Sequence, residues 1–315
     1  MIRTFAAAAI DGLTVVHDPV VGTNHLSPTT LPAGRIHLDQ AHVAAWPEAQ
    51  PGQLNPQAPL SMCYSLIVRC NLACPQCLDD KTVRESTAEE RQTMAGHIAA
   101  SGVLGVDLSG GEPLLLRDLP DVAKAIRAGG RTVVSCTTNG WHLARRAAEL
   151  APVLDGLRVS LDGATEATHD RWRGDGSYSR AIGGTRAAID EGLPVQFQMV
   201  LMRDNHREAQ QLLDRAAQLG VGGVTFLQML PIGDGRNIAE QQMLTDDEAT
   251  ATIDALTVPE GLRLRLRTRA KADGFTVLRA DSNAWRNTGG ATSITIRATV
   301  TSPQDLHLPV PGSAA

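Results

Sequence analysis

Apolar runs and helical patterns alternate along the middle of the chain. Short, mostly apolar runs bounded by turn residues predict six strands, namely Cys63–Val68, Val103–Leu108, Thr132–Cys136, Gly156–Leu161, Val195–Leu201 and Gly223–Met229. Between them, longer amphipathic segments predict five helices, namely Thr87–Ala100, Leu119–Ala128, His142–Leu150, Ser179–Glu191 and Arg207–Leu219. This alternation is typical of a parallel sheet wrapped by helices, and right-handed crossovers curl such a sheet toward a barrel. We therefore expect an α/β fold containing a partial (β/α)6 TIM-type barrel.

The two ends of the chain depart from this alternation. Residues 1–60 are rich in proline, and their short apolar runs Leu13–Val16 and Arg35–Leu38 predict two strands. The pattern does not separate a small accessory domain from an ordered arm laid over the barrel. We divide the chain into an N-terminal arm at residues 1–60 and a core barrel at residues 61–240. Residues 241–315 remain as a small α+β C-terminal extension.

The C-terminal extension has a weaker pattern. A capped helix is expected at Thr245–Leu256, because Thr-Asp-Asp-Glu opens it with acids in the first turn. Further strands are expected at Leu262–Arg267, Phe275–Arg279 and Thr292–Arg297, and disorder from Pro309 onward. The strict alternation of leucine and arginine places three arginines on one face. That face either looks into the barrel, where it would bind an anion, or forms an ordinary charged edge in solvent.

Composition limits the class of protein. The chain has 315 residues, of which 43% are hydrophobic, enough for one large barrel with a full core. The net charge of −5 gives no electrostatic case for nucleic-acid binding. The apolar run Phe5–Ile10 is too short for a signal peptide or a membrane span. We therefore expect a cytoplasmic, bacterial protein whose cysteines bind metal more readily than they form disulfides.

Three cysteines form the most informative motif. Cys70, Cys74 and Cys77 have the spacing C-x3-C-x2-C, with no fourth cysteine or histidine nearby. Three thiolates can bind three irons of a four-iron cluster and leave the last iron open to a ligand that is not protein. A structural zinc site is the alternative, but such sites usually need four protein ligands. The other cysteines, Cys63 and Cys136, are isolated in the sequence and are expected to be small buried residues.

Further motifs follow at the ends of successive predicted strands. Gly-Gly-Glu-Pro ends at Pro113, Thr-Asn-Gly contains Asn139, and Ser-Leu-Asp-Gly contains Ser160 and Asp162. Because strand side chains alternate, Ser160 and Asp162 point the same way, as a ribose diol would require. The segment His169–Tyr178 follows, in which His169 and Asp170 have helix capping and loop closure as their plainer interpretation.

The order of these motifs over residues 63–236 resembles the radical SAM (S-adenosylmethionine) enzymes. The resemblance implies one [4Fe-4S] cluster bound by Cys70, Cys74 and Cys77, with SAM on its open iron. It implies that SAM is bound by Gly110, Gly111, Glu112, Pro113, Asn139, Ser160, Asp162, Arg173 and Pro231. Among these, Glu112 would meet the methionyl amino group, Arg173 the SAM carboxylate or ribose, and the turn at Pro231 the adenine. No cysteine follows Cys136, so the auxiliary clusters of many relatives that modify peptides are not expected.

The resemblance also implies an activity. The cluster, reduced by a donor such as flavodoxin or ferredoxin, cleaves SAM to a 5′-deoxyadenosyl radical, which takes hydrogen from a substrate. The substrate is expected to be a small peptide or other natural-product precursor, and a viperin-like reaction on a nucleotide or phosphorylated sugar is the alternative. A non-catalytic iron–sulfur protein is the alternative from another class. Residues proposed for substrate contact are Gln196, Gln198, Gln228, Arg263 and Arg265. The sequence leaves the catalytic group and the reaction outcome open.

Overall fold

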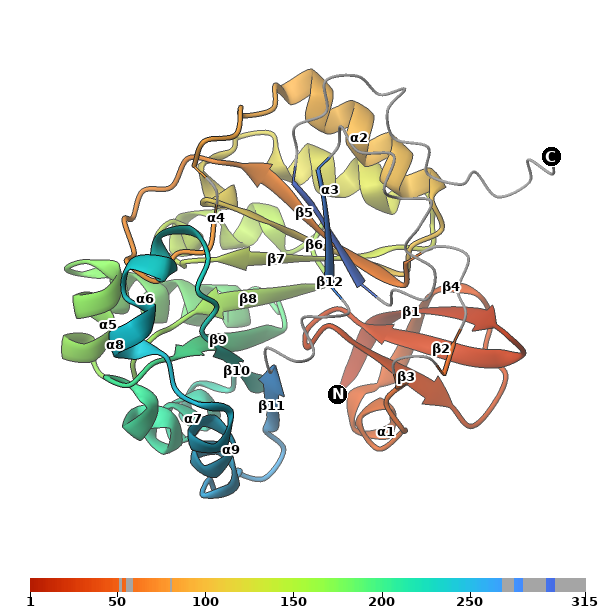
Figure 1. Ribbon diagram of the computed structural model, residues 1–315. Helices are drawn as coiled ribbons and strands as arrows, with labels where there is room; N and C mark the ends of the chain where they lie inside the picture. Colours follow the sequence, from red (N-terminus) through yellow and green to blue (C-terminus); the bar gives the residue numbers. More distant parts are fainter. Residues whose placement is uncertain (51–52, 55–58, 80, 268–274, 280–292, 298–315) are drawn as a thin grey trace.

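The computed structural model describes residues 1–50, 53–54, 59–79, 81–267, 275–279 and 293–297. Two sheets organise these residues (Figure 1). The first is a four-stranded antiparallel sheet of order β3-β2-β1-β4 near the N-terminus. Its strands are β1 (Ile2–Ile10), β2 (Leu13–Asp18), β3 (Thr23–Ser27) and β4 (Gly34–Asp39), followed by the short helix α1 (Gln40–Ala44). The arm expected at residues 1–60 therefore contains a sheet of its own, of which only β2 and β4 were predicted.

The second sheet is parallel and has nine strands in the order β11-β10-β9-β8-β7-β6-β5-β13-β12. Its strands are β5 (Ser61–Ile67), β6 (Gly105–Gly110), β7 (Val133–Thr138), β8 (Gly156–Ser160), β9 (Val195–Leu201), β10 (Gly223–Gln228), β11 (Arg263–Arg267), β12 (Phe275–Arg279) and β13 (Ser293–Arg297). The six central strands confirm the predicted core and its order along the chain. The strands from the C-terminal stretch extend this sheet at both edges, and the described strands form an open sheet without closing into a barrel.

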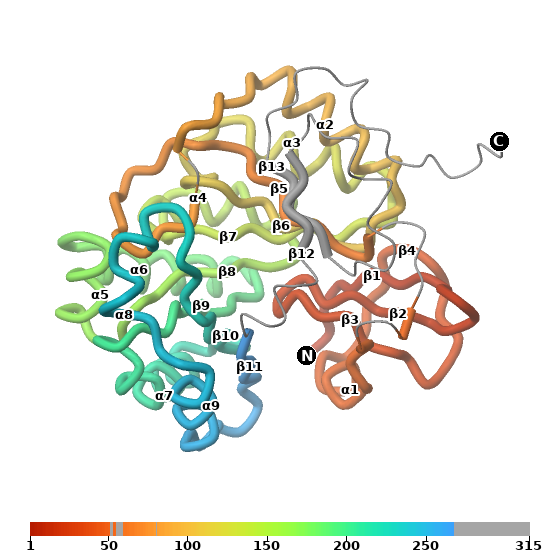
Figure 2. The backbone as a smooth tube through the Cα atoms, in the orientation of Figure 1, coloured from red at the N-terminus to blue at the C-terminus, as the bar shows by residue number. Residues whose placement is uncertain are grey.

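Helices connect the parallel strands and cover one face of the sheet (Figures 1 and 2). They are α2 (Ala88–Ala100), α3 (Leu119–Arg127), α4 (Leu143–Leu150), α5 (Glu166–Arg173), α6 (Ser177–Asp190), α7 (Ala209–Leu219), α8 (Ala239–Gln242) and α9 (Asp246–Asp254), with 3-10 turns η1 (Pro113–Leu115), η2 (His206–Glu208) and η3 (Gly233–Asn237). Thr87 and Glu90 form a capping box that begins α2, and Thr245 and Glu248 begin α9 in the same way. All five predicted helices of the core are present, whereas α5 was not predicted. Within the described residues, no helix combines the length and apolarity that crossing a membrane requires.

The two faces of the parallel sheet differ in chemistry. On the outer face, side chains such as Leu108, Val159 and Phe197 pack with the covering helices into the main apolar core. The opposite, inner face carries mostly polar residues, including Asp107, Arg158 and Gln198, because strand side chains alternate between faces. The outer face is packed with leucine and valine, whereas the inner face is polar. Because polar side chains that are buried need hydrogen-bond partners, the inner face is suited to polar contacts.

The N-terminal sheet lies at the amino-terminal ends of the parallel strands. A Cβ at Gly105, the first residue of β6, would clash with the His17 ring. Arg35 of β4 forms a bidentate ion pair with Asp155, just before β8, at 2.7 and 2.6 Å. In Figure 2 this red sheet therefore sits at the opposite end of the parallel strands from their carboxyl ends. The carboxyl ends, where sites on such sheets gather, are left for the motif-bearing loops.

Candidate active site at the carboxyl ends of the strands

The cysteine triplet lies on the loop that follows β5, at the carboxyl end of the parallel sheet. Cys70 is exposed, whereas Cys74 and Cys77 are half-buried, and a turn closed by Cys77 N donating to Cys74 O (3.1 Å) holds the last two together. Burial raises the pKa of all three thiols, that of Cys74 to about 11, and the three sulfurs interact electrostatically with one another. Three neighbouring thiols at a partly open edge could bind a soft metal centre, which deprotonates them on binding.

Glu112 links the loops that surround the cysteine loop. Its carboxylate is completely buried and accepts hydrogen bonds from Leu114 N (2.9 Å), Thr138 Oγ1 (2.7 Å) and Asn139 N (2.8 Å). Burial raises the pKa of Glu112, and these three donors oppose that rise. The carboxylate thus holds the end of β7 against the end of β6. These three internal donors give Glu112 a role in positioning this edge, and its contact with a ligand ammonium stays a prediction.

Gly110 and Gly111 let the end of β6 approach the cysteine loop. Gly110 has φ 116°, and a Cβ at either glycine would overlap backbone oxygens of Ile67 or Arg69. Two backbone hydrogen bonds join the two segments, one from Gly111 N to Ile67 O (2.7 Å) and one from Glu112 N to Arg69 O (2.9 Å). Only glycine permits this approach. The pair is therefore required by packing between two loops of the chain, and Pro113 next begins the turn η1.

Asp162 forms the centre of a buried polar network just beyond β8. Its carboxylate accepts from Gln76 Nε2 (2.6 Å), Arg173 Nε (2.6 Å) and Val200 N (2.9 Å), and the residue is completely buried. These contacts join the cysteine loop, α5 and β9. Because the carboxylate accepts from three of the chain's own donors, Asp162 positions these elements, and its contact with the ribose of SAM stays a prediction.

Arg173 brings a buried positive charge to the cysteine loop. Burial alone would lower its pKa, but the charges of Asp162 and Cys74 reverse this and raise the pKa of Arg173. The same guanidinium acts on Cys70. A cation held beside two thiols stabilises their thiolate forms and any anionic centre that they bind.

Gln76 was not predicted as a site residue, although it lies between two of the cysteines. It is 6% exposed, and because Nε2 donates to Asp162, its Oε1 must face away from that carboxylate. This Oε1 is buried and has no hydrogen-bond partner among the residues that the structure describes. A buried acceptor without a donor is rare, so it marks a place where a ligand N–H or O–H would be accommodated. The one feature of the sequence that could have indicated Gln76 is that it is a polar residue inside the cysteine motif.

The segment after Asp162 is largely structural. Asp170 accepts from Gly176 N, Ser177 Oγ and Tyr178 N, which closes the loop between α5 and α6. His169 is buried and accepts from Asp162 N (3.1 Å) through Nδ1, and burial lowers its pKa to about 4. A neutral imidazole therefore supports the backbone of Asp162. Loop closure, the plainer of the two interpretations from sequence, fits these contacts.

Ser160 and Asn139 also lie at this edge. Asn139 donates through Nδ2 to Asn71 Oδ1 (2.9 Å) and, over 3.8 Å, to Cys70 Sγ. It therefore supports the cysteine loop itself. Ser160 is half-buried on the inner face, the same side as Arg158. The contact of Ser160 with SAM stays a prediction.

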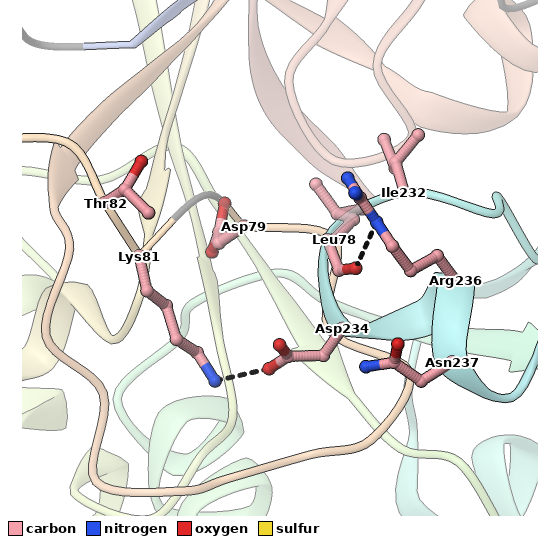
Figure 3. Close-up of a pocket in the computed structure, with 9 residues that line it drawn as sticks. Leu78, Asp79, Lys81, Thr82, Ile232, Asp234, Arg236 and Asn237 are labelled. Carbon is pink, nitrogen blue, oxygen red and sulfur yellow. Dashed lines mark hydrogen bonds and ion pairs between the residues drawn. The ribbon is translucent and has the colours of Figure 1, made fainter.

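A pocket of about 510 Å³ opens beside Cys77 (Figure 3). It lies between the cysteine loop and the turn after β10, and its lining includes Leu78, Lys81, Ile232, Asp234 and Arg236. An ion pair between Lys81 and Asp234 bridges the two loops, and Arg236 Nε donates to the carbonyl of Gly233 (3.1 Å).

Gly233 makes the close approach of these two loops possible. Its φ is +58°, and a Cβ there would lie 2.6 Å from Cys77 O. This is the turn expected to cradle adenine. Pro231 is exposed and adjoins the pocket without lining it.

The substrate candidates do not all face the same way. Gln196 and Gln198 lie on the inner face, where Gln196 Nε2 donates to Thr225 Oγ1. The buried Oε1 of Gln196 has no hydrogen-bond partner within the described part of the chain. Gln228 pairs with the outward Leu201 and donates to Asp246 Oδ1 at 3.1 Å. The expectation that Gln228 shares the inner face with the other two glutamines is therefore wrong, because alternation along β10 turns it outward.

The three arginines of β11 do face inward. They pair in register with Gly223, Thr225 and Leu227 of β10, on the inner face. Arg263 is bound to Asp18 and His25, and Arg265 donates to the carbonyl of Val21 at 2.8 Å. Of the two interpretations from sequence, the structure favours the inward face over a charged edge in solvent. Arg263 is committed to the N-terminal sheet and so contributes to structure.

A bound cluster fits the cysteine loop on its chemistry. Within the described residues, no three His, Cys, Asp or Glu side chains are arranged to hold a single metal ion. The fit therefore rests on three thiols of one loop that interact electrostatically, the cation of Arg173 acting on two of them and the cation of Lys81 acting on Cys77. Cys136 lies in the apolar core and Cys63 faces inward beside Ser109, so neither belongs to this group.

Comparison with known proteins gives the class. Residues 64–216 match the family model of the Radical SAM superfamily. The chain is 31% identical over 174 residues to a probable GTP 3′,8-cyclase of Metallosphaera sedula. This alignment covers 53% of this chain and 55% of that protein. A probable GTP 3′,8-cyclase of Saccharolobus solfataricus is 35% identical over 137 residues, 43% of this chain and 44% of that protein. The chain thus spans about half the length of these curated relatives.

Solved structures share the fold. SuiB of Streptococcus suis aligns with a TM-score of 0.53 and 13% identity over 84% of this chain and 71% of that chain. Methylornithine synthase (PylB) aligns with a TM-score of 0.54 and 14% identity over 79% of this chain and 74% of that chain. These structures share the parallel α/β fold of this chain. Residues 64–216 form a Radical SAM domain, and enzymes of this superfamily use a [4Fe-4S] cluster and SAM.

Proposed function

We propose that the chain binds one [4Fe-4S] cluster through Cys70, Cys74 and Cys77 and cleaves SAM reductively. When bound, the cluster supplies the electron that splits the SAM sulfonium into methionine and a 5′-deoxyadenosyl radical, which takes hydrogen from the substrate. The observation that carries the proposal is the loop itself, on which three neighbouring thiols lie beside the buried cation of Arg173. The matched family domain supports the same assignment.

The chain's own residues supply binding and orientation. Ser160 offers a hydroxyl on the inner face, and Gln76 offers a buried acceptor that needs a donor. Asp162 and Glu112 position other groups. Asp162 holds Gln76 and Arg173, and Glu112 holds the end of β7, in each case by buried hydrogen bonds to the carboxylate. SAM would lie between the cysteine loop, Ser160 and the turn at residues 230–236. The polar inner face below would hold the substrate and keep the radical away from water.

Two substrate classes are candidates. A small peptide or natural-product intermediate is the first, and one structural relative was crystallised as SuiB bound to a precursor peptide. A nucleotide or phosphorylated sugar is the second. The inward arginines of β11 favour this second class, as do relatives named probable GTP 3′,8-cyclases. We expect the electron to come from a flavodoxin- or ferredoxin-like donor.

Iron and sulfide analysis of the anaerobically reconstituted chain tests the cluster assignment. One cubane cluster requires about four irons and about four sulfides per chain. Replacing Cys70, Cys74 and Cys77 with Ala should abolish both, together with the broad visible absorbance. Cys63→Ala and Cys136→Ala are the matched controls and should retain the cluster. One zinc per chain without sulfide, or full iron content in the triple variant, would remove the cluster from this loop.

A further inference from the structure

Exposed cations gather where α4 and α6 pack together, beyond the carboxyl end of β7. Arg145 lies in the first turn of α4 and Arg180 in the first turn of α6, and both residues are exposed. Burial lowers the pKa of His142, and so do the charges of three arginines, at positions 145, 180 and 146. Arg146 is paired with Glu149. Neither Arg145 nor Arg180 forms an ion pair within the described part of the chain, so no carboxylate contact neutralises them.

Arg180 lies over the ring of Trp141, with its guanidinium carbon 4.3 Å from the ring centroid. This cation–π contact orients the guanidinium and leaves its charge in place. Trp141 is half-buried and directly follows Gly140, whose φ is +78°. A Cβ at Gly140 would lie 2.9 Å from the Cα of Ala181, so α6 packs directly on this turn. Because glycine permits this close approach, backbone packing fixes the positions of Trp141 and Arg180.

One side chain connects this surface to the cysteine loop. Trp141 N donates to Asn139 Oδ1 (2.9 Å). Asn139 Nδ2 in turn donates to Asn71 Oδ1 (2.9 Å) and, over 3.8 Å, to Cys70 Sγ. Cys70 is the exposed thiol of the triplet. The surface therefore lies beside the part of the cysteine loop that is open to solvent.

The charge of the whole chain limits what this surface can attract. The net charge is −5, so an acidic protein is repelled by the chain at long range. Its attraction must come from a local group of cations, which also orients it. Interfaces place aromatic side chains at their centre and charges at their rim. A half-buried indole beside exposed arginines therefore matches a partner whose planar apolar group is surrounded by carboxylates.

We propose that Trp141, His142, Arg145 and Arg180, here called the cationic patch, form the docking surface for an acidic electron-transfer protein of the flavodoxin type. The exposed edge of its flavin ring would meet Trp141, and its carboxylates would meet the two arginines. One electron would pass from the reduced flavin to the cluster, and no bond would form or break. This inference rests on the proposed function, which requires an electron from outside the chain. Electron-transfer complexes are small and weak, so a few charges suffice to orient one.

Binding of a recombinant bacterial flavodoxin to the full chain tests the cationic patch without turnover. Biolayer interferometry would be run at about 20 mM and about 200 mM sodium chloride, because salt screens exposed charges. The double variant Arg145→Gln/Arg180→Gln should weaken binding about tenfold at low salt and lose most of the salt dependence. Arg145→Lys/Arg180→Lys keeps both charges and should bind within about twofold of wild type. Lys124→Gln/Arg131→Gln removes two exposed cations elsewhere, on α3 and before β7, and should leave binding unchanged.

A second readout compares two electron donors on the reconstituted chain. With NADPH, flavodoxin reductase and limiting flavodoxin, Arg145→Gln/Arg180→Gln should release 5′-deoxyadenosine from SAM about tenfold more slowly than wild type. With dithionite, a small reductant that needs no docking, the two should be equal. An equal loss with both donors would indicate damage to the site and overturn the proposal. Equal flavodoxin binding by both proteins, or binding of a ferredoxin but not of flavodoxin, would overturn it as well.

The two proposals can fail separately. Flavodoxin binding is measured on the full chain before and after reconstitution, so it does not depend on a cluster. A chain that cleaves SAM with dithionite but binds flavodoxin independently of the two arginines would lose the cationic patch and keep the proposed function. A chain that binds flavodoxin through these arginines but assembles no cluster would keep the docking surface and lose the proposed function.

Discussion

At the scale of single residues, the site depends on carboxylates that act through their neighbours. Glu112 and Asp162 are both completely buried, and each accepts three hydrogen bonds from the chain. Both residues could be singled out from their motifs, but the hydrogen bonds that they form with other parts of the chain could not. Gln76, Arg173 and Val200 are far apart in sequence and meet at Asp162 only in the folded chain. A motif identifies the residue types needed, whereas the fold decides which of them remain available to a ligand.

Asp162→Ala and Ser160→Ala should therefore behave differently. Asp162→Ala leaves the buried Arg173 without its ion-pair partner and should lower the free energy of unfolding by about 3–5 kcal/mol. Ser160→Ala removes one neutral contact and should weaken SAM binding by about two- to tenfold, with stability unchanged. Urea denaturation and SAM dialysis on reconstituted protein measure the two effects. If Asp162→Ala were as stable as wild type, or Ser160→Ala bound SAM normally, the roles assigned here would be wrong.

At the scale of elements, hydrophobic periodicity predicted the six core strands and five of the helices to within a few residues. It did not predict β1 or β3 of the N-terminal sheet. β1 contains Phe5–Ala9, and alanine favours helix over strand, so its pattern carries no strand signal. β3 is Thr-Asn-His-Leu-Ser and forms only because β2 lies beside it. Strand parity within β11 put the three arginines on one face, but only the register with β10 shows that this face is the inner one.

The contact between β2 and the parallel sheet should make stability depend on pH. His17 is packed against Gly105, and burial lowers its pKa to about 4 from an ordinary value of 6.5. The unfolded chain therefore binds a proton between about pH 6.5 and pH 4 that the folded chain excludes. Stability then falls as the pH is lowered through this range, and His17 alone should account for about 1.5 kcal/mol between pH 6.5 and pH 5.

Chemical denaturation at a series of pH values checks this expectation. His169 has a pKa lowered in the same direction, so wild type should show the sum of both contributions. His17→Gln, which can still donate to Asn24, should be less stable at pH 7 but lose less of its stability on acidification. Identical pH slopes for wild type and His17→Gln would show that His17 is protonated in the folded chain as readily as in the unfolded one.

At the scale of the whole molecule, the two ends of the parallel sheet have separate roles. The carboxyl ends hold the cysteine loop, the Asp162 network and the pocket beside Cys77. The amino ends are closed by the N-terminal sheet, whose loop 18–22 binds Arg158 and Arg265. The polar inner face lies between them. Under the proposed function, SAM would bind at the carboxyl end of that face and the substrate would lie on the polar face beside it.

Production of 5′-deoxyadenosine tests the central claim most directly. Reconstituted protein given dithionite and SAM should release 5′-deoxyadenosine slowly on its own and much faster with substrate, because a bound C–H consumes the radical productively. The variant in which Cys70, Cys74 and Cys77 are all Ala should release none, and Cys63→Ala should match wild type. Release of S-adenosylhomocysteine instead would indicate a methyl transfer. Release of neither product, with cluster and SAM both shown to be bound, would contradict reductive cleavage and favour a non-catalytic iron–sulfur protein.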